Sequence, residues 1–218
     1  MTAPLIKICG LSTIPALDAA LDSGADMVGF VFFPPSPRNI GYDTARALAA
    51  RVAGRATKVS LTVDADDATL AALIEALQPD LLQLHGRETP ARVAAIREKF
   101  GLPVMKALGV STAADLAAIA LYEPLVDRIL FDAKPPADAT RPGGNGLAFD
   151  WRLIGDAPIR KPWMLSGGLD AENIAEAIRV TGAPGIDVSS GVESSPGVKD
   201  LDKIKNFVAA ARLAYAKQ

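Results

Sequence analysis

The stretch Trp163-Met164-Leu165-Ser166-Gly167-Gly168-Leu169-Asp170 joins a short apolar run to a glycine-rich turn and then to an aspartate of the kind that opens helices. The stretch Gly185-Ile186-Asp187-Val188-Ser189-Ser190-Gly191 repeats the apolar run and the glycine-containing turn. Apolar runs this short are typical of strands that are buried on both faces. Outward from these two stretches, strand and helix signals alternate along the whole chain.

Eight short apolar runs are separated by Ala- and Leu-rich stretches of helical period. They recur about every 27 residues, which is the length that a strand, two loops and a helix need in a parallel crossover. The runs are Leu5–Cys9, Met27–Phe33, Lys58–Val63, Leu81–His85, Val104–Leu108, Arg128–Asp132, Trp163–Ser166 and Gly185–Ser189.

Helix openings follow most of these runs as Ser, Thr or Asp residues. They stand at Ser12–Thr13, Asp43–Thr44, Asp66–Asp67, Thr89–Pro90, Ser111–Thr112, Phe149–Asp150, Asp170 and Asp200. Eight such units predict an α/β fold, a (βα)8 TIM barrel of eight parallel strands that forms a single domain over residues 1–218. An open doubly wound sheet uses the same alternation, but no GxGxxG motif follows the first run.

The composition excludes several classes of protein. Half of the 218 residues are hydrophobic, 22% are charged and the net charge is −2, so nothing predicts binding to nucleic acid or to a membrane. One Cys and one His cannot form an internal disulfide or a His- and Cys-rich zinc site. We therefore expect a cytoplasmic protein without a bound metal.

Polar side chains end four of the predicted strands, where barrel enzymes carry their active sites. Alternation along each strand puts Cys9, His85, Asp132 and Asp187 on inward faces if the barrel forms. Lys7 shares the face of Cys9, and its ammonium group would lower the pKa of the thiol. The alternatives are a buried apolar cysteine, a carboxylate paired with a loop cation, and a histidine ring that is hydrogen-bonded at the barrel mouth.

The glycine-rich turns after the last two runs predict a phosphate site. Glycines let backbone N–H groups approach an anion, and a helix N-terminus adds partial positive charge. The predicted phosphate-binding residues are Gly167, Gly168, Ser189, Ser190 and Gly191. The alternative is two ordinary turns. Arg38 lies in a proline-stiffened loop and is either an exposed arginine or a bidentate ligand for a carboxylate.

Seven segments spread from the first run to the last together resemble the phosphoribosylanthranilate isomerase family. They are Lys7-Ile8-Cys9-Gly10-Leu11, Gly29-Phe30-Val31-Phe32, Ser36-Pro37-Arg38-Asn39-Ile40, Gln83-Leu84-His85-Gly86, Phe149-Asp150-Trp151, Ser166-Gly167-Gly168-Leu169 and Asp187-Val188-Ser189-Ser190-Gly191-Val192-Glu193. One departure is Gly143-Gly144-Asn145-Gly146, where the family usually has Gly-Gly-Thr-Gly. This tetrapeptide lies in the long irregular stretch Ala133–Ala148, which we predict to be a lid over bound ligand.

The resemblance implies an Amadori rearrangement of N-(5-phosphoribosyl)anthranilate in tryptophan biosynthesis, without cofactor or metal. It implies that Cys9 is the general base, that Asp132 is the general acid and that Arg38 binds the anthranilate moiety. His85 and Asp187 are expected to bind substrate, a small phosphosugar, and the protein to be a monomer or homodimer. The rival hypotheses are another phosphosugar enzyme of the same fold and a catalytically inactive barrel that acts as a scaffold.

Overall fold

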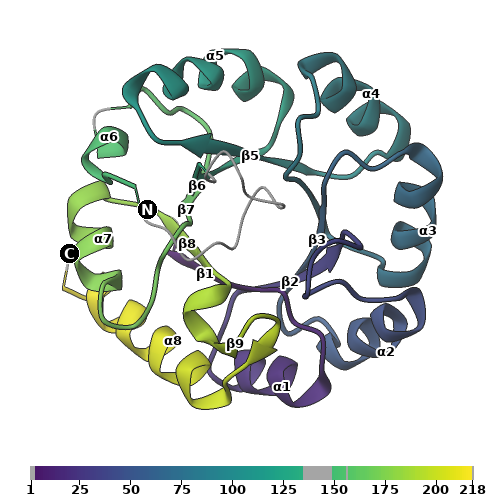
Figure 1. Ribbon diagram of the computed structural model, residues 1–218, viewed down its shortest axis with the longest axis horizontal. Helices are drawn as coiled ribbons and strands as arrows, with labels where there is room; N and C mark the ends of the chain where they lie inside the picture. Colours follow the sequence, from purple (N-terminus) through teal and green to yellow (C-terminus); the bar gives the residue numbers. More distant parts are fainter. Residues whose placement is uncertain (1–2, 135–148, 156, 218) are drawn as a thin grey trace.

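Eight parallel strands close into a barrel at the centre of the structure (Figure 1). The computed structural model describes residues 3–134, 149–155 and 157–217. The strands follow chain order around the barrel, and β1 pairs with β8 to close it. They are β1 (Leu5–Cys9), β2 (Met27–Phe32), β3 (Thr57–Thr62), β4 (Leu81–Leu84), β5 (Val104–Val110), β6 (Arg128–Ala133), β7 (Trp163–Leu165) and β8 (Gly185–Val188). The predicted (βα)8 barrel is thereby confirmed.

Helices form an outer ring around the barrel (Figure 1). They are α1 (Ile14–Asp22), α2 (Tyr42–Val52), α3 (Asp67–Leu77), α4 (Pro90–Phe100), α5 (Ala118–Tyr122), α6 (Arg152–Gly155), α7 (Ile174–Thr181) and α8 (Leu201–Tyr215). The 3₁₀ segments are η1 (Ala113–Ala117), η2 (Glu123–Leu125) and η3 (Ser190–Val192), and a hairpin of β9 (Glu193–Ser195) and β10 (Val198–Lys199) follows η3. The openings predicted at Ser111–Thr112 and Phe149–Asp150 precede only short segments, η1 and α6.

Four helices begin where the sequence predicts. The capping side chains, each accepting a hydrogen bond from a first-turn N–H, are Thr13, Asp66, Thr89 and Asp200. Two predicted starts are wrong. Helix α2 begins after Gly41 instead of at Asp43–Thr44, because its N-cap has no side chain to reveal it. Helix α7 begins at Ile174, because Asp170 accepts the N–H of Asn173 in a turn ahead of the helix.

The barrel interior changes from apolar to polar toward the carboxyl ends of the strands. The apolar part of the interior is formed by Met27, Val59, Leu81, Met105, Ala107, Leu130 and Met164. Next along the inward faces come Lys7, Gln83 and Asp187, all buried. A second, larger apolar cluster lies between the strands and the helices. The two clusters fix the strands rigidly beneath the polar groups at the barrel mouth.

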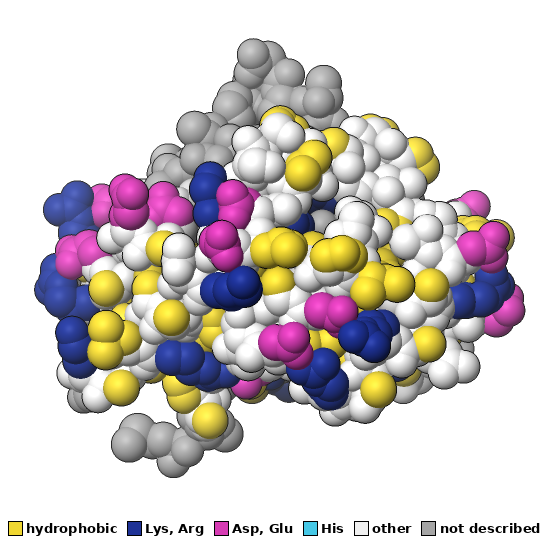
Figure 2. Space-filling model, turned by 90° about the horizontal axis from the view of Figure 1, so that it is seen from below, with side chains coloured by type: hydrophobic (Ala, Val, Ile, Leu, Met, Phe, Trp, Pro, Cys, Tyr) yellow, Lys and Arg dark blue, Asp and Glu magenta, His cyan; other side chains and the backbone are white. Residues whose placement is uncertain are grey.

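The outer surface carries both signs of charge without separating them. Figure 2 shows Lys and Arg side chains interspersed with Asp and Glu over the visible wall. Some of these charges pair between helices, as Arg51 of α2 does with Asp18 of α1. Among the described residues, no helix combines the length and the apolar character that a membrane span requires.

Candidate active site

Polar side chains from four strands meet at the carboxyl end of the barrel. Cys9 ends β1, Asp132 lies near the end of β6, and Asp187 lies on β8. His85 directly follows β4, and its backbone N–H donates to the Thr62 carbonyl at 2.8 Å. All four are at the ends of neighbouring or facing strands of one closed sheet, which is where barrel enzymes bind substrate.

A buried ion pair supports Cys9. The Lys7 Nζ atom lies 2.8 Å from Asp187 Oδ1, and the lysine side chain is fully buried. Glycine is required at position 29 of β2, because a Cβ there would lie 2.9 Å from Cys9 Sγ. The thiol therefore lies in a closely packed pocket beside the Lys7 chain.

Burial decides the ionisation of the thiol. Burial raises the pKa of Cys9 above its usual value, and the Lys7 ammonium opposes this only in part. The expectation that Lys7 brings the pKa of Cys9 down is therefore wrong in net direction. Burial alone would also lower the pKa of Lys7, but the Asp187 carboxylate outweighs it and that pKa is raised. The negative charge of Asp187 offsets part of the positive charge of Lys7, so Lys7 lowers the pKa of the Cys9 thiol less than it would alone.

A chain of hydrogen bonds supports Asp132. His85 Nε2 lies 3.1 Å from Asp132 Oδ2, and Gln83 Nε2 lies 3.0 Å from His85 Nδ1. The other carboxyl oxygen, Oδ1, accepts the Ala133 N–H at 2.9 Å. Asp132 and Gln83 are buried, and the histidine side chain is 10% exposed. The histidine ring thus lines the mouth as a hydrogen-bonded group.

The two glycine-rich turns lie between the thiol and the carboxyl group. A Cβ at Gly167 would lie 3.0 Å from Asp132 Oδ1, and the Ser189 hydroxyl donates to the Cys9 carbonyl at 3.2 Å. The turns also touch each other, because a Cβ at Gly191 would collide with the Leu169 carbonyl.

The backbone of these turns is shaped to receive an anion. Gly167 and Gly168 have φ values of +91° and +66°, which favour glycine. No oxygen in residues 3–134, 149–155 and 157–217 accepts a hydrogen bond from the N–H of Gly167, Gly168 or Gly191. All three glycines are only partly buried, so a ligand oxygen can reach these N–H groups from the barrel mouth.

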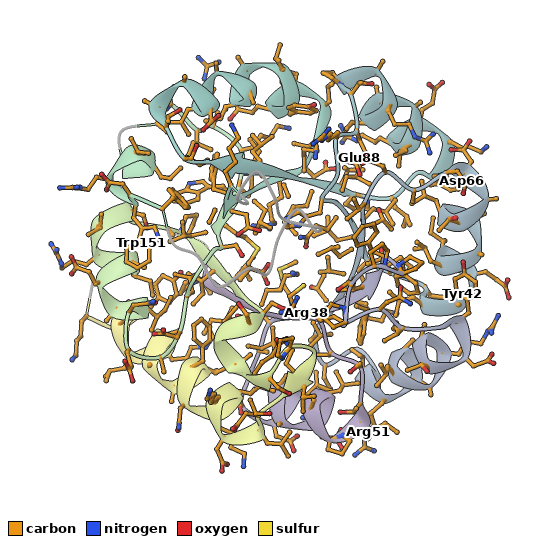
Figure 3. All side chains as sticks on the ribbon, in the orientation of Figure 1. Arg38, Tyr42, Arg51, Asp66, Glu88 and Trp151 are labelled. Atoms are coloured by element: carbon orange, nitrogen blue, oxygen red, sulfur yellow. The ribbon has the colours of Figure 1, made fainter. Side chains whose placement is uncertain are left out.

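Arg38 is held by a carboxylate of the chain itself. Its Nε and Nη2 atoms donate to Glu193 at 2.7 and 2.9 Å, and the residue is 4% exposed, so the alternative of an exposed arginine is wrong. Figure 3 places Arg38 nearer the barrel axis than Arg51, which lies on the outer helices. Lys199 binds the same carboxylate at 2.8 Å and the Ser189 carbonyl at 2.8 Å.

The ion-pair cluster of Arg38, Glu193 and Lys199 joins the Arg38 loop to the turn after β8. Burial would raise the pKa of Glu193, but Arg38 and Lys199 outweigh it and that pKa is lowered. Burial lowers the pKa of Lys199 despite its bond to Glu193. Sequence reasoning assigned no role to Glu193 or Lys199. The only signal was the position of Glu193 four residues after Ser189, within one of the quoted motifs.

The predicted lid and the expectation of no bound metal concern other parts of the chain. Residues 135–148, most of the predicted lid, and the Gly143-Gly144-Asn145-Gly146 departure lie outside the described residues. Among the residues that are described, no group of three or more His, Cys, Asp and Glu side chains is placed to hold a metal ion.

A thiol and a carboxyl group beside two glycine-rich turns at the mouth of a (βα)8 barrel are typical of one class of protein, the barrel enzymes that act on phosphorylated substrates. The model of the N-(5′-phosphoribosyl)anthranilate isomerase family matches residues 6–210. A relative of that name from Bradyrhizobium sp. (strain ORS 278) is 61% identical over 210 residues, 96% of each chain.

Solved structures agree. The phosphoribosyl anthranilate isomerase of Thermotoga maritima has a TM-score of 0.86 and 37% identity, covering 96% of this chain and 98% of its own. An isomerase in complex with reduced 1-(o-carboxyphenylamino)-1-deoxyribulose 5-phosphate has a TM-score of 0.82 and 34% identity over the same shares. The chain belongs to the N-(5′-phosphoribosyl)anthranilate isomerase family, the isomerases that act in tryptophan biosynthesis.

Proposed function

We propose that Cys9 and Asp132 carry out the isomerisation of N-(5′-phosphoribosyl)anthranilate as general base and general acid. One observation carries this assignment. The turn at Gly167 touches Asp132, and the turn at Ser189 touches Cys9, so a phosphate bound between the turns places a ribose beside both groups. Each positioned acid or base contributes about 10²–10⁴-fold to a rate.

The acid acts first. Asp132 donates its proton to the ring oxygen of the ribose while the C1′–O bond breaks. The nitrogen lone pair forms the C1′=N bond, which leaves a protonated Schiff base and an Asp132 carboxylate. This positive nitrogen makes the hydrogen on C2′ acidic, so the second proton transfer needs only a moderate base.

The base then acts on carbon. The Cys9 thiolate removes the C2′ proton, and the bonding electrons form a C1′=C2′ bond and neutralise the nitrogen. The resulting enolamine gains a proton at C1′ and loses the proton of its C2′ hydroxyl, giving the ketose. Lys7 favours the thiolate through its charge, against the cost of burying it.

The remaining site residues bind substrate in this proposal. Gly167, Gly168, Ser189, Ser190 and Gly191 hold the phosphate with their backbone and hydroxyl groups. Arg38, oriented by Glu193, binds the anthranilate carboxylate. His85 and Asp187 line the ribose part of the pocket.

We further propose that the chain works in the cytoplasm as a monomer or homodimer. The cytoplasmic location is supported by the family, whose members are biosynthetic isomerases that act on a small phosphosugar. Light scattering of the purified protein separates the two oligomeric states. A mass above that of a dimer would contradict this proposal.

Turnover of freshly prepared N-(5′-phosphoribosyl)anthranilate tests the function. The loss of anthranilate fluorescence measures the reaction. The wild type should convert the substrate, and Cys9→Ala and Asp132→Asn should each lose about 10²–10⁴-fold in kcat. Binding of the phosphate ester without turnover by the wild type would contradict the proposal and favour the scaffold. A Cys9→Ala or Asp132→Asn variant with wild-type kcat would overturn the assignment of that residue.

A further inference from the structure

Gln83 takes no part in the chemistry proposed above, yet it is buried inside the barrel next to the acid. It lies on β4, two residues before His85, so both side chains lie on the same face of the strand. Its amide nitrogen is 3.0 Å from His85 Nδ1. Its amide oxygen is buried and has no hydrogen-bond partner among the described residues. An amide that leaves its own oxygen unpaired while it contacts a histidine needs an explanation.

The orientation of the Gln83 amide decides where the imidazole carries its hydrogen. With the amide nitrogen toward the ring, as the structure has it, Gln83 donates and His85 Nδ1 accepts with its lone pair. The hydrogen of a neutral ring is then on Nε2, which points at Asp132 Oδ2 from 3.1 Å. The Nε2–H therefore donates to the carboxyl group.

The same contacts distinguish the two oxygens of Asp132. Oδ2 accepts from His85 whether the carboxyl group is neutral or ionised. Oδ1 accepts the Ala133 N–H at 2.9 Å and lies against the Gly167 turn, where a Cβ would come within 3.0 Å of it. Oδ1 is therefore the carboxyl oxygen on the side of the phosphate turn.

We propose that Gln83 is a positioning residue for the reaction. It holds His85 in the Nε2–H tautomer, which keeps Asp132 Oδ2 as an acceptor and leaves Oδ1 to deliver the proton. The hydrogen bond strengthens as the proton leaves, because a carboxylate accepts more strongly than a neutral carboxyl group. This inference rests on the proposed role of Asp132 as the acid.

The wild-type protein allows a direct test, because His85 is its only histidine. In protein labelled with ¹⁵N-histidine, NMR should show a protonated Nε2 and an unprotonated Nδ1 at the pH of the assay. A ring with hydrogen on Nδ1, or on both nitrogens, would overturn the proposal. This measurement needs no variant and is independent of folding effects.

Substitution of Gln83 tests the effect on catalysis. Gln83→Met keeps the length of the side chain and removes the amide. It should lower kcat by roughly 10- to 100-fold, by analogy with the loss of hydrogen bonds that orient metal-bound histidines, with KM little changed. Gln83→Glu offers an acceptor to Nδ1 and should move the hydrogen there, with a larger loss of kcat. The matched control is Ser60→Ala on β3, a buried hydroxyl without a partner among the described residues, which should keep wild-type kcat.

A double variant separates positioning from packing. In His85→Gln the side-chain amide still donates to Asp132 but has no tautomer to fix, so Gln83→Met should have little further effect on kcat. An equal loss in both backgrounds would show that Gln83 only fills space and would overturn the proposal. If Asp132→Asn keeps wild-type kcat, the acid assignment fails. If Asp132→Asn is inactive while Gln83→Met has wild-type kcat, only the role of Gln83 fails.

Discussion

On the β1–β8 side of the barrel mouth, Cys9 lies beside a buried ion pair of Lys7 and Asp187. On the β4–β6 side, Asp132 lies beside the amide of Gln83 and the imidazole of His85. The first group must lose a proton to act as a base, and a nearby cation favours that loss. The second must hold a proton until the substrate needs it, and the side chain that its carboxyl group contacts is an imidazole instead of a lysine. The support on each side matches the proposed role.

The two kinds of support also differ in their cost to stability. Removing one partner of a buried ion pair leaves an unpaired charge, which costs about 3–5 kcal/mol. Removing a partner from a hydrogen-bonded chain leaves an unsatisfied polar group, at about 1–3 kcal/mol. The base side should therefore be the more sensitive of the two.

Lys7→Met should have the largest effect on stability. It leaves the Asp187 carboxylate buried and unpaired, so we expect the free energy of unfolding in urea to fall by about 3–5 kcal/mol. Lys7→Met combined with Asp187→Leu removes both charges and should regain much of this loss. A Lys7→Met protein as stable as the wild type would show that the ion pair is not needed.

Glu193→Gln should have the next largest effect on stability. It extends the comparison to the ion-pair cluster around Arg38. It keeps the shape of the side chain but removes the carboxylate that orients Arg38. The glutamine oxygen can still accept from the buried Arg38, so we expect the free energy of unfolding to fall by about 2 kcal/mol, less than for the full loss of a buried ion-pair partner. KM for substrate should rise while kcat changes less, because Arg38 is proposed to bind. An unchanged KM would contradict that role for Arg38.

The pH profile sharpens the comparison on the base side. The pKa of Cys9 is raised by burial, so the thiolate increases with pH and kcat/KM should rise on the alkaline side of neutrality. Lys7 lowers that pKa in part, so Lys7→Met should move the rise to higher pH. The same profile for wild type and variant would show that the Lys7 charge does not act on the thiol.

Asp115→Ala should have the smallest effect and gives a reference in the turn that opens η1. The Lys134 ammonium and the N–H groups of Ser111 and Thr112 all donate to Asp115, and together they hold the pKa of its carboxyl group well below its usual value. Loss of such a cap costs about 1 kcal/mol in the free energy of unfolding, with kcat unchanged. The difference from wild type should be complete above about pH 5 and shrink as the pH falls further, because a lowered pKa stabilises the fold only while the group is ionised. A difference that is constant with pH would contradict this.

Local signals in the sequence predicted the strands and most helix starts. Apolar runs mark strands buried on both faces, and Thr13, Asp66 and Thr89 are side-chain caps that the sequence shows directly. The start of α2 was missed because Gly41 caps it without a side chain.

The contacts within the site were less predictable. Lys7 and Asp187 pair across 180 residues through the closure of the barrel, and Arg38 meets Glu193 across 155 residues. The pKa of Cys9 was predicted in the wrong direction, because burial outweighs the neighbouring charge and the sequence does not show the depth of a thiol. Inward faces follow from alternation, but partners depend on which strands become neighbours.

Kinetic isotope effects test most directly whether Cys9 removes the proton from C2′ and Asp132 protonates the ring oxygen. Substrate prepared from [2-²H]ribose 5-phosphate carries deuterium at the carbon from which Cys9 takes a proton. In Cys9→Ser, C–H cleavage limits the rate, and kcat should fall markedly on deuteration. In Asp132→Asn, ring opening limits the rate, and deuteration should leave kcat nearly unchanged. A large isotope effect in Asp132→Asn together with none in Cys9→Ser would contradict the assignment of the two groups.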